Sequence, residues 1–68
     1  MQPTRYEIRI ACAPSDTIRA AFPELEAVQL APASTMLSGI IRDQSELHGL
    51  VARLGDLGID ITEIRTQP

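Results

Sequence analysis

The sequence predicts a small α+β domain in which two helices cover one face of a four-stranded antiparallel sheet. Residues 42–58 carry the pattern of one complete amphipathic helix, and an apolar-rich segment over residues 59–64 follows it directly. Residues 6–12 alternate apolar and polar side chains, which is typical of a strand with one buried face. A helix that leads at once into such a strand is expected to pack on a sheet.

The first half of the chain is expected to form a strand, a short helix and two further strands. The first strand covers residues 6–12 and stops before Pro14. Ser15 is suited to cap a helix over residues 16–21, and Pro23 ends that helix because proline lacks a backbone N–H donor. Alternation then predicts strands over residues 27–30 and 35–41, joined by a turn. The expected core side chains of the first strand and helix are Tyr6, Ile8, Ile10, Ile18 and Phe22.

The long helix carries a signal at each end. Asp43 is a good N-cap, and Glu46 follows three residues later, as in a capping box. Gly58 lies where a left-handed residue commonly ends a helix. The apolar stripe between these signals comprises Leu47, Leu50, Val51, Leu54 and Leu57. A last strand is expected over residues 59–65.

The predicted order of elements is therefore strand, helix, strand, strand, helix, strand. Right-handed crossovers bring both helices to the same side of the sheet, so we expect a ferredoxin-like βαββαβ plait with strand order 4-1-3-2. We expect residues 1–68 to form a single domain, because the chain is too short for a second core. Residues 1–4 and 66–68 are expected to be flexible ends.

Composition argues against several classes of protein. The chain is 44% hydrophobic and 22% charged, as in a globular domain, and its net charge of −3 argues against non-specific binding to nucleic acid or an anionic membrane. It shows no signal-peptide pattern and no apolar run near the roughly 20 residues that cross a bilayer, so we expect a cytoplasmic protein. A domain of this size buries only about 60% of its unfolded surface, so association with a second chain would add useful burial.

The sheet face without helices is the candidate functional surface. Alternation places its charged residues, Glu7 and Arg9, near the middle of the first strand. The full candidate interface is Glu7, Arg9, Met36, Ser38, Ile40, Thr62 and Ile64. Met36, Ile40 and Ile64 would provide burial, while the charged pair would provide polarity and register. We interpret this surface as an interface for a homodimer or for another protein.

Two side chains leave a catalytic alternative open. Cys12 is the only cysteine and His48 the only histidine, so either could be the working group of a small cofactor-free enzyme. The simpler interpretation makes Cys12 a small buried hydrophobe and His48 a residue at the boundary of the helical stripe. Because the chain has no CxxC pair and no set of metal-ligand residues at suitable spacing, no cofactor and no metal are predicted.

Other domains of the same architecture match less well. RNA-recognition modules stack bases on aromatic side chains of the central strands, whereas these strands offer Arg9, Met36 and Ser38. An ACT-type regulatory domain, which binds a small metabolite, has the same order of elements. Its usual glycine in the first loop is missing here, where Ala13 and Pro14 stand. A metabolite-binding regulatory domain is therefore the second alternative to an interaction module.

Three segments resemble a family of small uncharacterised actinobacterial proteins. They are YEIRI at residues 6–10, AFPEL at residues 21–25 and DQSELHGLVARLGDLG at residues 43–58, the last being the most specific. The resemblance covers most of the chain and implies a stand-alone ferredoxin-like domain of bacterial, cytoplasmic origin. It implies no catalytic residue. The absence of Lys, with all six basic residues Arg, is in keeping with a GC-rich genome.

Overall fold

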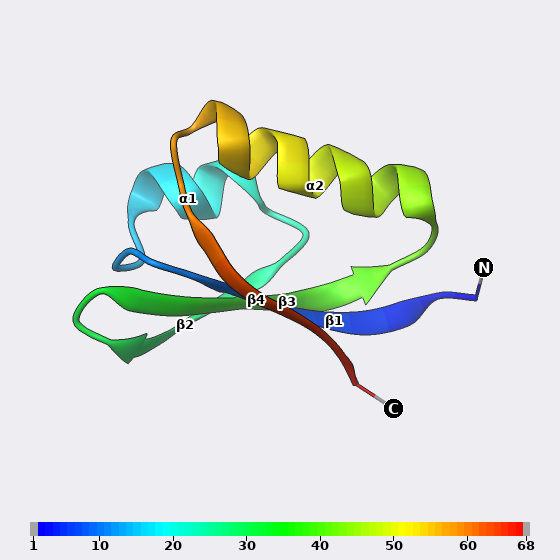
Figure 1. Cartoon of the computed structure of the whole chain (residues 1–68), viewed down its shortest axis with the longest axis horizontal. Coiled ribbons are helices and arrows are strands. Elements are labelled where there is room, and N and C mark those ends of the chain that lie inside the picture. Colours follow the sequence, from blue (N-terminus) through cyan, green and yellow to red (C-terminus); the bar gives the residue numbers. More distant parts are fainter. Residues whose placement is uncertain (1, 68) are drawn as a thin grey trace.

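The computed structural model describes residues 2–67, which form one four-stranded antiparallel sheet with both helices on the same face (Figure 1). The order of strands across the sheet is β2-β3-β1-β4, which confirms the predicted 4-1-3-2 arrangement. The elements are β1 (Thr4–Ile10), α1 (Asp16–Ala21), β2 (Glu26–Ala31), β3 (Ser34–Ile41), α2 (Gln44–Asp56) and β4 (Ile61–Gln67).

Both helices begin at the caps that the sequence predicts. The Ser15 side chain accepts a hydrogen bond from the backbone N–H of Ile18, and the Asp43 carboxylate accepts one from Glu46 at 2.8 Å. In a standard capping box, the carboxylate three residues into the helix accepts a hydrogen bond from the N–H of the N-cap residue. Here the Glu46 carboxylate accepts instead from the N–H of Arg42, the residue before the N-cap. Gly58 has a φ of 72°, so it is the left-handed residue that turns the chain from α2 toward β4.

The core lies between the helices and the two central strands. Its buried apolar side chains are Ile8, Ile10, Ile18, Phe22, Leu37, Ile41, Leu50 and Leu54. Leu57, expected in the helical stripe, is instead 43% exposed. The reason is that α2 ends at Asp56, so Leu57 is the C-cap, and Ile59 packs against the core after the turn.

The strands reach closer to both ends of the chain than the sequence predicts. Thr4 pairs with Ile41, and Gln67 pairs with Arg5, so these residues of the expected flexible ends belong to the sheet. Residues 1 and 68 of those ends lie outside the described part of the chain. At the other end of β1, the strand stops at Ile10 rather than at Cys12, and the N–H of Ala11 bonds to the Asp60 carbonyl.

Candidate functional site

The register of the two central strands determines which residues lie on the open face of the sheet. Ile8 lies opposite Leu37, and both are buried under the helices. Directly opposed residues of an antiparallel pair share a face, and neighbours along a strand alternate between faces. The pairs Glu7–Ser38 and Arg9–Met36 therefore lie on the other side, together with Ile40. These are the β1 and β3 positions that the sequence predicts for this face.

The fourth strand has the opposite phase to the predicted one. Ile61 lies opposite Ile10 and Glu63 opposite Arg9, which leaves Thr62 as an extra residue in a bulge. Beyond the bulge, Ile64 pairs with Ile8, so the prediction that Ile64 joins the open face is wrong. It lies on the helix side of an edge strand and is 41% exposed.

The bulge residue Thr62 is held by the backbone of the neighbouring strand. Its hydroxyl donates to the Arg9 carbonyl at 3.2 Å, so it serves the pairing of β1 with β4. The residues that β4 gives to the open face are Glu63, Arg65 and Gln67. Sequence reasoning missed them, although charged residues on both sides of Ile64 were a usable signal.

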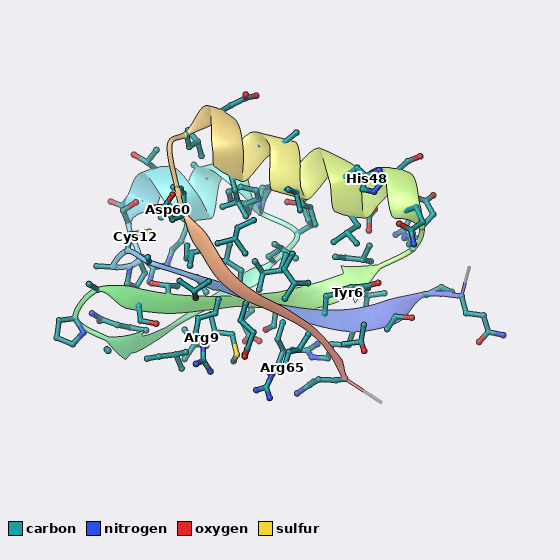
Figure 2. All side chains as sticks on the ribbon, viewed as in Figure 1. Tyr6, Arg9, Cys12, His48, Asp60 and Arg65 are labelled. Atoms are coloured by element: carbon teal, nitrogen blue, oxygen red, sulfur yellow. The ribbon has the colours of Figure 1, made fainter. Side chains whose placement is uncertain are left out.

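The edge strand β2 adds Glu26 and Val28 to the same face. Glu26 lies opposite Ser38, and Val28 lies opposite Met36. Val28 and Ile40 are 44% and 53% exposed, so two large apolar side chains of this face meet solvent. Figure 2 shows Arg9 and Arg65 projecting from the side of the sheet that the helices leave uncovered.

The arginines of the open face differ in their partners. Arg65 contacts two carboxylates, with Nε 3.2 Å from Glu63 and Nη2 4.0 Å from Glu7. Arg5 lies 3.7 Å from the Glu26 carboxylate and donates to the Ser38 hydroxyl. Within residues 2–67, Arg9 forms no ion pair, and its Nε is buried without a hydrogen-bond partner. The central arginine of this face is thus the one without an acidic partner in its own described chain.

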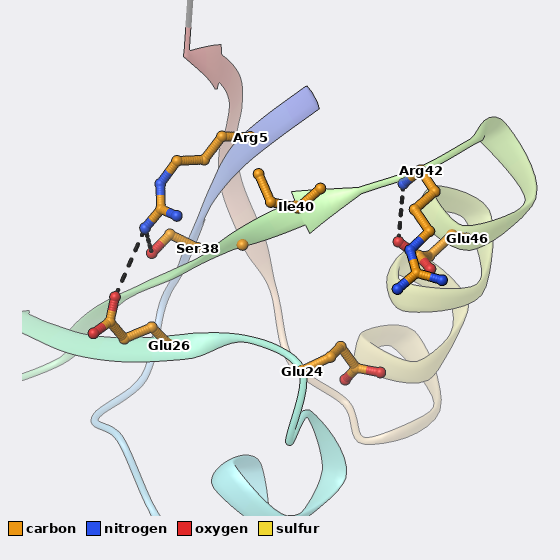
Figure 3. Close-up of a pocket in the computed structure, with 8 residues that line it drawn as sticks. Arg5, Glu24, Glu26, Ser38, Ile40, Arg42 and Glu46 are labelled. Carbon is orange, nitrogen blue, oxygen red and sulfur yellow. Dashed lines mark hydrogen bonds and ion pairs between the residues drawn. The ribbon is translucent and has the colours of Figure 1, made fainter. Parts of the chain in front are cut away.

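A polar cleft opens at the rim of this face, beside the end of β3 (Figure 3). It forms because β2 begins opposite Ser38, so the last three residues of β3 have no β2 residue beside them. Its volume is about 610 Å³. The charged residues around it are Arg5, Glu24, Glu26, Arg42 and Glu46. This mixture of signs suits a small polar molecule rather than an apolar one.

The two candidate catalytic side chains lie apart. Figure 2 shows Cys12 near the start of α1 and His48 toward the opposite end of the molecule, on α2. Cys12 is half-buried against the core, and its carbonyl accepts a hydrogen bond from the buried hydroxyl of Thr35 at 2.6 Å. His48 is exposed. Across residues 2–67, no group of three or more His, Cys, Asp and Glu side chains could hold a metal ion.

No helix in the described range is both long enough and apolar enough to cross a membrane. Comparison with curated proteins gives no significant match, and neither does comparison with solved structures. A family model described as "Domain of unknown function (DUF8691)" matches residues 5–65, which spans all six elements apart from the ends of β1 and β4. The chain therefore belongs to the DUF8691 family of domains of unknown function.

Proposed function

We propose that this domain is a non-catalytic association module that forms a homodimer through the open face of its sheet. The observation that carries the proposal is the composition of that face at its centre. Arg9, which has no acidic partner within residues 2–67, lies directly beside Met36, and Val28 follows on the next strand. A second chain over this face would bury the apolar side chains and supply a carboxylate to Arg9.

The size of the domain supports association. Within residues 2–67, its core consists of eight buried apolar side chains. A standard interface buries about 800 Å² on each partner. This area is roughly a fifth of the 4247 Å² that the chain exposes. Dimerisation would therefore add substantially to the apolar area that the fold alone removes from water.

The charges of the face favour a second copy over a strongly charged partner. Three Arg and three Glu side chains project from it, so its net charge is zero. They are Arg5, Arg9 and Arg65 with Glu7, Glu26 and Glu63. A neutral face of mixed sign can be complementary to itself, whereas an acidic or basic partner would meet like charges. The cytoplasmic, bacterial setting implied by the resemblance is part of this proposal.

The polar cleft supports a second candidate function, the binding of a small metabolite by Arg5 and Arg42. Arg5 and Ile40 belong both to the cleft and to the open face, so a ligand there would lie at the rim of the dimer. Native mass spectrometry of protein purified from its own host separates the two functions. A dimer without extra mass supports the association module, and a retained small molecule supports the cleft.

A pair of matched variants tests the surface itself. Val28→Glu places a charge on the open face, and Leu57→Glu places the same charge beyond α2, at nearly equal exposures of 44% and 43%. We expect Val28→Glu to raise the dissociation constant of the dimer by about tenfold or more, since the new carboxylate would be buried without an opposite charge. Leu57→Glu should leave it unchanged. A wild-type monomer at every accessible concentration would contradict the proposal, and so would equal effects of the two variants.

A further inference from the structure

Four charged side chains alternate in sign on the open face where β1 and β4 run side by side. The register puts Glu7 opposite Arg65 and Arg9 opposite Glu63. Each charge therefore has an opposite charge across the strand pair and another two residues along its own strand. These four residues, Glu7, Arg9, Glu63 and Arg65, form a charge quartet. The bulge at Thr62 creates this pattern, because it brings Glu63 and Arg65 to the open face.

The charge quartet is unevenly satisfied within one chain. Arg65 approaches both carboxylates, whereas Arg9 forms an ion pair with neither of them. The Glu7 side chain is only 16% exposed, and the Nε of Arg9 is buried without a partner in the described chain. Buried polar groups are normally hydrogen-bonded. A hydrogen-bond acceptor from a second chain at Arg9 would therefore be favourable.

We infer that the charge quartet sets the register of the homodimer, with Arg9 of each copy paired with Glu7 of the other. The inference rests on the proposed dimer and specifies how its two faces meet. Glu7 and Arg65 form one row across the strand pair, and Arg9 and Glu63 form the next row. The required two-fold axis lies between the two packed sheets, runs perpendicular to the strands, and passes between these two rows. Rotation about this axis places each row of one copy over the other row of the second copy, so every charge meets its opposite.

This axis is favoured because it makes all four strands of one sheet overlap all four of the other. Met36 then faces Ser38 of the second copy, within an interface as wide as the sheet. An axis parallel to the strands, between β1 and β4, would also match the charges by pairing Arg9 with Glu63. It would leave β2 and β3 without a facing strand, because β4 is an edge strand, and so would bury less surface.

The first test reverses one charge and measures the dissociation constant of the full chain by analytical ultracentrifugation. Arg9→Glu places like charges at two symmetry-related pairs, so we expect the dissociation constant to rise roughly a hundredfold or more. The control, Arg19→Glu, makes the same change in net charge on the exposed surface of α1 and should alter it by less than about twofold. A wild-type dimer that Arg9→Glu leaves intact would overturn the inference while the proposed dimer stands.

Two double variants of identical composition test the pairing. Arg9→Glu with Glu7→Arg exchanges the two members of the proposed contact, so the dimer should form again. Arg9→Glu with Glu63→Arg puts Glu against Glu and Arg against Arg in the proposed register, so this protein should remain monomeric. Recovery by the second variant but not by the first would overturn the proposed axis. If circular dichroism shows that the first variant is unfolded, Glu63→Arg with Arg65→Glu exchanges the other pair and should dimerise, and a monomer would again overturn it.

Discussion

Gly39 lies where two segments of the chain come closest. It pairs with Tyr6 in the sheet and faces the helix side, where the turn after α1 passes over it. A Cβ atom at Gly39 would lie 2.8 Å from Cδ2 of Leu25 and 3.1 Å from the carbonyl oxygen of Glu24. The first contact involves the flexible end of a side chain, but the second involves backbone. The absence of a side chain here lets residues 24–25 enter β2 directly against the sheet.

We expect Gly39→Ala to lower the free energy of unfolding by about 1–3 kcal/mol, because the added methyl group overpacks this contact. Gly49→Ala is the matched control. It adds the same methyl group in the interior of α2, where no atom beyond the neighbouring residues and the backbone of the helix itself lies within 4 Å, and should raise stability by up to about 1 kcal/mol. Urea unfolding followed by circular dichroism measures both. A Gly39→Ala protein as stable as the wild type would show that the turn moves aside without cost.

At the scale of an element, the N-terminus of α2 is closed by two reciprocal side-chain bonds. Asp43 accepts from the N–H of Glu46, and Glu46 accepts from the N–H of Arg42. These bonds fix the point where β3 gives way to the helix that carries Leu50 and Leu54 into the core. The cap also holds Arg42 and Glu46 at the polar cleft, so it positions part of a candidate binding site.

Replacing the capping carboxylate isolates the contribution of this cap. Asp43→Ala should cost about 1 kcal/mol of unfolding free energy, because the N–H of Glu46 loses its acceptor. Asp43→Asn keeps an oxygen at the same place and should retain most of the stability. Thermal unfolding of the three proteins measures the difference. Equal losses in Asp43→Ala and Asp43→Asn would assign the effect to charge at the helix terminus rather than to the hydrogen bond.

The elements differ in how well their sequences specify them. The caps of α1 and α2, and the alternation of β1 and β3, depend on residues close together in the chain, and both could be predicted. The phase of β4 depends on a bulge at Thr62, which forms against a strand more than fifty residues earlier. No local pattern encodes such a pairing, so alternation along the strand predicts the wrong face for Ile64. The charge quartet was missed for the same reason, because it exists only once β1 and β4 are in register.

At the scale of the whole molecule, dimerisation would make the thermal stability of this chain depend on its concentration. If folding and association are linked, the native state is stabilised by mass action, and its melting temperature depends on protein concentration. A monomeric domain unfolds at the same temperature at all concentrations. The charge quartet adds a dependence on salt, since the Debye length falls from about 10 Å at 0.1 M to about 3 Å at 1 M.

We therefore expect the melting temperature of the wild type to rise by several degrees over a hundredfold increase in protein concentration. Arg9→Glu should melt at a temperature independent of concentration, because its sheet face stays uncovered. That temperature should lie below that of the dilute wild type, because the new carboxylate lies opposite Glu63 in the strand pair. Differential scanning fluorimetry at low and high salt measures both effects. Higher salt should reduce the concentration dependence of the wild type without removing it, because Met36 and Val28 are buried by a force that salt does not screen. A concentration-independent wild type would mean that the open face stays in water and that Arg9 keeps its buried Nε unpaired within the described chain.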